Sequence, residues 1–181
     1  MEVTAGGAEV ARIDRAVDVL AYGQWAGTRA LPELLAAFSL PNNAAIDRLI
    51  FQAGERLAKS GGGRTMNGYQ SKNREDVWAQ VSAIYGAVGA ANLHYSEPPA
   101  SFGTDGQKIR TPDRVLSGGV APCLDLAMLL ASCLEPAGLS PVVLMKKGHA
   151  WAGCWLTRHF GGSTPSWRGK VAGRGWMTVP R

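Results

Sequence analysis

The chain has 181 residues, of which 46% are hydrophobic and 18% are charged, and its mean hydropathy is −0.05. This composition excludes a disordered chain, which is poorer in apolar residues, and no apolar run approaches the ~18 residues of a membrane span. The start of the chain carries acidic residues and does not match a signal peptide. We therefore expect a cytoplasmic globular protein with a substantial core.

The net charge of +5 belongs to the end of the chain. From Ala150 onward there are five basic residues and no acidic ones, whereas the first 149 residues hold 14 basic and 14 acidic side chains. A neutral body argues against a broad nucleic-acid-binding face, because such a face carries a basic stripe. Only the basic tail is left to contact polyanions, and the simpler interpretation is that it is solvated.

Residues 8–95 are predicted to form a mainly helical N-terminal part. Its first segment has apolar residues at helical spacing, namely Val10, Ile13, Val17 and Leu20. Pro32 then opens a short apolar segment, as a proline in the first turn of a helix does. Asn42 or Asn43 caps the next helix, which ends at three consecutive glycines, and Asn73 caps another.

The second part of the domain is predicted over residues 96–160. It starts with a loop, 96–107, that is rich in proline and glycine and contains Gln107. Thr111, followed by proline and aspartate, is a start signal for a short helix. The most apolar helix is predicted over 122–134, where a proline precedes its first turn and a proline and a glycine follow its end.

Two strands follow this apolar helix, at 142–145 and 149–156, with a turn between them. Alternation along the second strand places His149, Trp151, Gly153 and Trp155 on one face. The two tryptophans either pack over the apolar helix or form the wall of an acyl-binding groove. Residues 161–181 then form a glycine-rich basic tail that has neither the apolar spacing of a helix nor that of a strand. We interpret this irregular tail as a replacement for the end of a longer domain.

Three cysteines, Cys123, Cys133 and Cys154, form an odd set without a C-x-x-C motif. A disulfide framework is not expected in a cytosolic chain of this size. Cys154 and His159 lack a second ligand pair, so we expect neither a metal site nor another cofactor.

The strongest chemical signal is Cys123, in the first turn of the apolar helix, with His149 at the start of a strand. Backbone N–H groups and the positive end of the helix dipole favour a thiolate at Cys123. A nearby imidazole takes up the thiol proton and later returns it to a leaving group. The alternative is an inert buried cysteine, because free cysteine is among the most buried residue types.

Three segments around this pair resemble the core of the bacterial transglutaminase-like superfamily, which has a papain-like fold: 118–127 (GGVAPCLDLA), 134–143 (LEPAGLSPVV) and 148–151 (GHAW). In that family a glycine precedes the cysteine, an aspartate follows two residues later, and a histidine starts a later strand. The resemblance covers about residues 104–157. It implies an α+β fold in which Cys123 and His149 are a catalytic pair.

The resemblance also bears on Asp125 and Gln107. Asp125 occupies the position of the family's aspartate, and because it points about 200° away from Cys123 we expect a structural role in the first turn. Papain-like enzymes use an upstream glutamine as an oxyanion donor, and Gln107 is the candidate for that role. The alternative for Gln107 is an ordinary loop amide.

The third catalytic residue of the family has no counterpart here. The family orients its histidine with Asp or Asn on the following strand, but no Asp, Asn, Glu or Gln follows His149. Asp105 or a backbone carbonyl group is left to replace it, and losing such a partner lowers the rate by orders of magnitude. Loss of the family's last strands would also leave an open sheet edge, which favours association.

A second resemblance extends over the N-terminal part, from Trp25 through Tyr69 and Gln70 to the segment 106–110 (GQKIR). This stretch is similar to the N-terminal region of large bacterial helicase-like proteins linked to DNA processing or phage defence. It implies that the partners include other domains of such a protein.

These patterns predict an α+β, transglutaminase-like domain that hydrolyses a peptide or isopeptide amide, or transfers its acyl group, through Cys123 and His149. Because the third catalytic residue is missing, the sequence does not decide whether the domain is catalytically active. We expect it to bind a protein or peptide substrate and not to bind a membrane. Association into an oligomer remains an option. One alternative is a non-catalytic interaction module of a nucleic-acid-processing protein, and another is nucleic-acid binding by the tail.

Overall fold

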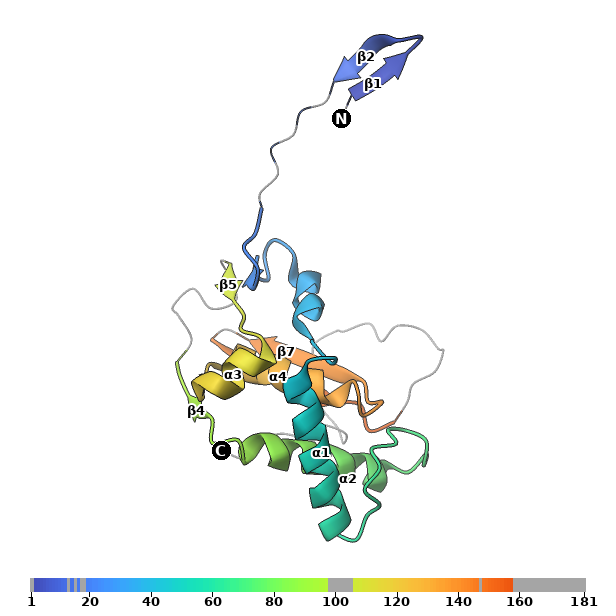
Figure 1. The fold of residues 1–181 in the computed structure, drawn as a ribbon, viewed down its shortest axis with the longest axis vertical. Helices are drawn as coiled ribbons and strands as arrows, with labels where there is room; N and C mark the ends of the chain where they lie inside the picture. Colours follow the sequence, from blue (N-terminus) through green and yellow to red (C-terminus); the bar gives the residue numbers. More distant parts are fainter. Residues whose placement is uncertain are drawn as a thin grey trace.

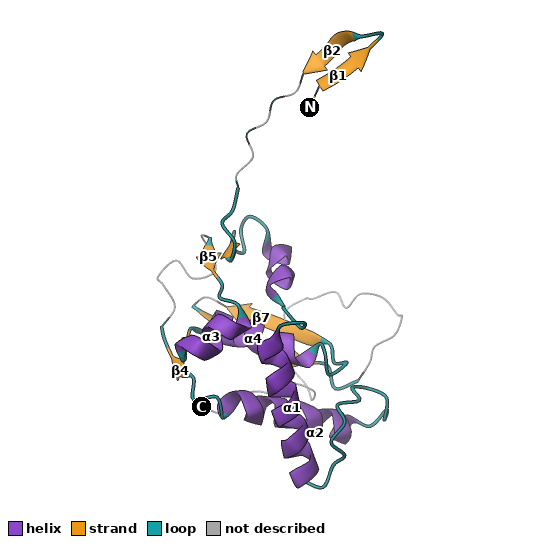
Figure 2. Cartoon of the chain, viewed as in Figure 1, coloured by secondary structure: helices purple, strands orange, loops and turns teal. Residues whose placement is uncertain are grey.

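Two layers form the body of the molecule, a group of helices and a β-hairpin that lies along the most apolar helix (Figure 1). The computed structural model describes residues 2–12, 14, 16, 19–97, 106–146 and 148–157. Helices and strands are both present, so the α+β class expected from the sequence is confirmed (Figure 2). None of the helices in the described part of the chain combines the length and the apolar character needed to cross a membrane.

Helices α1 (Ala44–Lys59) and α2 (Arg74–Gly89) pack against each other in the first half of the chain. Both begin at an asparagine, because the side chains of Asn43 and Asn73 accept hydrogen bonds from N–H groups of the first helical turn. Their facing apolar residues are buried, namely Ile46, Leu49, Ala53 and Leu57 of α1 with Val77, Val81, Ile84 and Val88 of α2. This pair forms most of one core cluster.

Helix α4 (Cys123–Leu134) lies at the centre of the fold, and most of its residues are buried. It follows helix α3 (Pro112–Gly118) and the short strand β6 (Val120–Ala121). Gly119 ends α3 in the left-handed conformation, at φ 67°, which a glycine adopts without strain. Strand β6 and Pro122 then lead directly into α4.

Strands β7 (Pro141–Lys146) and β8 (His149–Cys154) pair antiparallel, with Lys146 opposite His149. Ala150 and Cys154, on alternate positions of β8, are buried against the helices. Ala150 belongs to the core cluster of Cys123 and the first turns of α4, whereas Cys154 belongs to the cluster of Leu134. Strand β8 therefore starts beside the N-terminal end of α4 and ends beside its C-terminal end.

Short strands connect the N-terminal half of the chain to the region around α4. Strand β3 (Gln24–Trp25) pairs antiparallel with β5 (Gln107–Lys108), and β4 (His94–Tyr95) pairs parallel with β6. The 3-10 helix η1 (Pro32–Phe38) begins at the proline, as expected. The prediction of a loop through Gln107 is wrong at this residue, because pairing with Trp25 places it in a strand.

The helix predicted from Val10 to Leu20 is also wrong. Strands β1 (Glu2–Ala5) and β2 (Ala8–Arg12) form a hairpin that Figure 1 shows apart from the rest of the molecule, and Val19–Leu20 are not helical. Gly6 and Gly7 have φ angles of 60° and 82°, so they form a tight two-residue turn that aligns the two strands. Residues 8–95 are therefore helical mainly over α1 and α2, and the tail predicted over 161–181 lies outside the described residues.

Candidate functional site

Cys123 is the first residue of α4, and its thiol lies at the N-terminal end of the helix. Pro122 precedes it in an extended conformation, which ends β6 and starts the helix. The N–H groups of a first helical turn have no partners within the helix, so this end of α4 favours negative charge. Cys123 is only 4% exposed and packs in one cluster with Trp25, Ile109 and Ala150.

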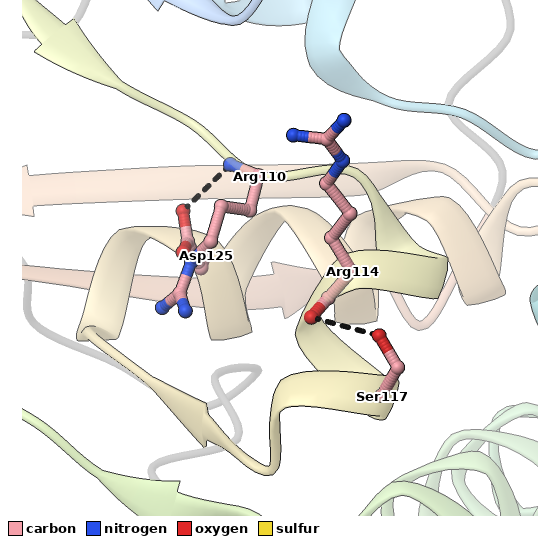
Figure 3. Close-up of polar contacts among 4 residues, drawn as sticks. All are labelled: Arg110, Arg114, Ser117 and Asp125. Carbon is pink, nitrogen blue, oxygen red and sulfur yellow. Dashed lines mark hydrogen bonds and ion pairs between the residues drawn. The ribbon is translucent and has the colours of Figure 1, made fainter.

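Asp125 fixes the segment after β5 across the first turn of α4. Its Oδ2 atom lies 2.7 Å from Nε of Arg110, and its Oδ1 atom accepts the backbone N–H of Arg110 at 3.2 Å (Figure 3). The Asp125 side chain is 1% exposed, whereas that of Arg110 is 32% exposed. The structural role expected of Asp125 is therefore confirmed, and its carboxylate holds residues 109–110 beside Cys123.

Gln107 lies two residues before Ile109 on this same segment, so both side chains face inward. The Gln107 residue is 6% exposed, and its Oε1 atom is buried without a hydrogen-bond partner in the described structure. Trp25, opposite Gln107 in the β3–β5 pair, belongs to the core cluster of Cys123. An amide with unused hydrogen-bonding capacity thus lies on the segment that crosses the start of α4.

His149 is the first residue of β8 and is half-buried at the Cys123 end of the hairpin. Its ring meets the Trp151 ring edge to face, with 4.6 Å between the centroids. The ammonium group of Lys146 lies 5.7 Å from the centroid of the Trp151 ring. The imidazole therefore contacts the ring of Trp151 and lies near that of Tyr95, and no carboxylate among the described residues hydrogen-bonds to it.

Tyr95 of β4 joins the two candidate catalytic residues. Its ring centroid lies 6.5 Å from that of His149, and β4 pairs with β6 so that Tyr95 lies opposite Ala121, two residues before Cys123. Desolvation of the hydroxyl group and the charge of Cys123 raise the pKa of Tyr95 above its ordinary value. The sequence did not indicate Tyr95, because its position depends on the pairing of β4 with β6. No local sequence pattern predicts that pairing.

The structure thus brings Cys123 and His149 to one corner of the molecule with Tyr95 as their shared neighbour. Within the described chain, no hydrogen bond joins the thiol directly to the imidazole. Asp105, considered as an orienting acid for His149, lies outside the described residues.

The remaining candidates lie away from this corner. Trp155 follows the end of β8, about 20 Å along the strand from His149, and its carbonyl group accepts a hydrogen bond from the Tyr69 hydroxyl at 2.6 Å. His94 is exposed on β4, and His159 lies outside the described residues. Of the two tryptophans on the predicted strand face, only Trp151 is close to the imidazole.

The other two cysteines are protected by burial. Burial raises the pKa of the Cys133 thiol to about 12 and also raises that of Cys154, which lies 3.7 Å from the Tyr69 hydroxyl group. Thiols with raised pKa values are poor nucleophiles at neutral pH. Among the described residues, no three His, Cys, Asp or Glu side chains cluster in a way that would hold a metal ion.

The geometry defines the chain as an α+β protein with a helix N-terminal cysteine and a strand-borne histidine at one corner. A scan against protein-family models and searches of curated proteins and of solved structures found no match to this chain.

Proposed function

We propose that this chain is a transglutaminase-like thiol hydrolase that cleaves a peptide or isopeptide amide with Cys123 and His149. The observation that carries the proposal is that the first residue of α4 and the start of β8 meet in one core cluster, in which Cys123 packs with Ala150, the chain neighbour of His149. A cysteine at a helix N-terminus and a histidine at the facing strand end are the two groups that thiol-based acyl chemistry needs.

In the first half of the reaction, His149 takes the proton of the Cys123 thiol and the thiolate attacks the carbonyl carbon of the amide. A C–S bond forms, and the carbonyl π electrons move to oxygen. The side-chain N–H of Gln107 and the backbone N–H of Cys123 donate to this oxyanion. The oxyanion collapses, the C–N bond breaks, and His149 gives its proton to the departing amine.

In the second half, water attacks the carbonyl carbon of the thioester while His149 takes a proton from the water. The C–S bond then breaks, the carboxylic acid leaves, and the proton returns to the Cys123 sulfur. Hydrolysis is favoured over transfer because nothing in the described residues forms a second site for an amine. No cofactor takes part in these steps.

A substrate that reaches His149 meets Trp151, whose ring contacts the imidazole, and the ammonium group of Lys146 over the Trp151 ring. Their chemistry, an indole face beneath an ammonium group, suits an extended peptide with an acidic or carbonyl-rich segment. We further propose that the protein acts in the cytoplasm on a protein or peptide substrate, as one part of a larger nucleic-acid-processing protein.

The second candidate is a non-catalytic interaction module. It is favoured by two observations, the 4% exposure of Cys123 and the absence of a direct hydrogen bond from its thiol to His149 in the described structure. In that case Cys123 is a core residue, and binding to a partner survives its replacement by alanine.

Residue-resolved alkylation decides between these two functions. The intact protein is treated with iodoacetamide at pH 6, and each thiol is quantified by mass spectrometry. We expect Cys123 to react at least about 10-fold faster than Cys133 and Cys154, and His149→Ala to remove most of that difference, because the imidazole accepts the thiol proton. His94→Ala is the matched control, since His94 is exposed on another strand. Equal slow labelling of all three cysteines would leave the interaction module as the function.

A further inference from the structure

We propose that the groove between α2 and the outer edge of β8 is a docking site for an extended peptide of another protein, which adds to β8 as a third strand. The peptide carries apolar side chains at alternate positions and an acidic residue at the end that meets the start of α2. Docking there does not depend on whether Cys123 is a nucleophile, so the inference goes beyond the proposed function.

Three hollows form this groove, and each contains Leu156, which lies two residues after β8. The hollow at the start of α2 has a volume of about 610 Å³ and includes Asn73. The next hollow contains Trp78, and the narrow third one, of about 30 Å³, lies beside Tyr85. From Asn73 to Tyr85 the groove follows α2 for about 18 Å, which is the length of about five residues in a strand.

The backbone of β8 offers hydrogen-bonding groups on this side. The N–H of Trp155 donates to the carbonyl group of Ser140, which fixes the alternation along the hairpin. Because hydrogen-bonded residues alternate in an antiparallel pair, the N–H and carbonyl groups of Ala152 and Cys154 point away from β7. Pro141, which lacks an N–H group, occupies an outward position of β7, as this alternation requires. Among the described strands only β7 pairs with β8, so the outer edge can accept a further strand.

Exposed aromatic rings on α2 give this edge its apolar surroundings. Trp78 and Tyr85 lie seven residues apart on one face of the helix, and they are 45% and 38% exposed. Ala152 and Cys154 line the same groove across from Tyr85. Since alternate side chains of a strand point to one face, every second side chain of the added peptide meets the helix side. Apolar residues at those positions would cover the two rings.

Charge complementarity determines which end of the peptide is acidic. Lys72 and Arg74 line the hollows at the start of α2, together with one acidic residue, Glu75. The described residues that line the hollow beside Tyr85 carry no ionised carboxylate or basic group. The net positive charge is therefore confined to one end of the groove, and an acidic side chain of the peptide binds there.

Selection of random eight-residue peptides displayed on phage, with the full chain as bait, tests this docking site. We expect the enriched peptides to share alternating apolar residues and one acidic residue. A synthetic copy of one of them should bind Trp78→Ala at least about 10-fold more weakly than the wild type, because a central aromatic contact is lost. Phe51→Ala is the matched control, since Phe51 is an exposed aromatic residue on α1. Enrichment of no peptide, or equal affinity for these two variants, would overturn the proposal.

A pair of proline variants tests the backbone pairing. Ala152→Pro removes an N–H group from the outer edge of β8, whereas Val143→Pro, directly opposite in β7, removes one from the other edge of the hairpin. We expect Ala152→Pro alone to weaken peptide binding, by about 5-fold, while circular dichroism shows both variants to be folded. Equal binding by the two proline variants would show that the peptide does not pair with β8. A dimer in sedimentation analysis that Trp78→Ala dissociates would assign the groove to a second copy of the chain and would also overturn the proposal.

Discussion

At the residue scale, the ion pair between Arg110 and Asp125 gives the clearest energetic test. Arg110→Ala leaves the buried carboxylate of Asp125 without its cation and without the charge-assisted hydrogen bond from Nε. Breaking a pair in which one charge is fully buried costs about 3 kcal/mol, so we expect that loss in the free energy of urea-induced unfolding.

Arg114 supplies the control for this prediction. Its side chain extends away from Asp125 in Figure 3, and the residue is exposed on α3. We expect Arg114→Ala to change the free energy of unfolding by less than about 0.5 kcal/mol. Equal losses for the two arginine variants would contradict the importance assigned to the buried carboxylate.

The chemistry of single residues could be predicted only where it depends on local geometry. The structural role of Asp125 followed from its angle to Cys123 on the helix, and the inward side chain confirms it. The strand position of Gln107 and the site position of Tyr95 could not be predicted, because each depends on a partner strand far away in the sequence. A two-residue strand carries no periodicity of its own.

At the element scale, Gly68 joins the loop before α2 to the loop after α4. A Cβ atom at Gly68 would lie 2.6 Å from the carbonyl oxygen of Gly138, and Gly68 also has a φ of 56°. We expect Gly68→Ala to destabilise the protein by about 3 kcal/mol in urea, because it adds a backbone clash to the strain of a left-handed residue.

Gly61 separates these two causes. It has a φ of 89°, but a Cβ atom there meets nothing within 4 Å. Gly61→Ala should therefore cost only the left-handed strain, about 1 kcal/mol. If both alanine variants lose the same stability, the contact between the two loops is not what requires a glycine at position 68.

The joint between α1 and α3 is predicted to depend on pH. Hydrogen bonds from Thr111 and then from Asn43 lower the pKa of Asp113 below its ordinary value of 3.8. Since the folded pKa is below the unfolded one, the ionised carboxylate adds stability above the unfolded value, and this contribution is lost as the pH falls through the folded value. The urea midpoint of Asp113→Asn should lie below that of the wild type at pH 6 and match it towards pH 2.

Glu33 offers the comparison for this experiment, because it is an exposed carboxyl group on another element. The difference between the wild type and Glu33→Gln should not follow the pH profile seen at position 113. A pH-independent difference for Asp113→Asn would show that its carboxylate does not stabilise the joint.

Helices were predictable where they begin with a local signal. Asn43, Asn73 and Thr111 each precede a helix, as expected, and Cys123 starts α4 directly after a proline. The wrong helix over the first residues had periodicity without a capping residue, while two adjacent glycines signalled a hairpin turn. The conformational preference of these glycines decided the local structure, and the apolar spacing from Val10 onward did not.

At the scale of the whole molecule, the β1–β2 hairpin is predicted to be dispensable for folding. It lies apart from the body in Figure 1, and the two strands pair with each other. Deleting residues 2–12 should change the free energy of unfolding of the remaining chain by less than about 0.5 kcal/mol, measured in urea by circular dichroism. A loss above about 1 kcal/mol would indicate that the hairpin packs on the body.

The order of the main elements could be predicted from the sequence, from α1 to the hairpin of β7 and β8, because each has its own periodicity and end signals. The site corner could be predicted only as two separate residues, Cys123 and His149. The position of their neighbour Tyr95 depends on the whole fold. Strand β4 follows α2 in the chain and lies near the start of α4 only because it pairs with β6.

One phenol closes the far end of the hairpin. Tyr69 donates to the carbonyl oxygen of Trp155 and accepts from the N–H of Ser140, while the N–H of Trp155 donates to the carbonyl oxygen of Ser140. Three residues that are distant in the chain therefore form a closed ring of hydrogen bonds. As a result, both strands are tied at this end to the loop between α1 and α2, and neither strand can leave that loop without breaking at least one of these bonds.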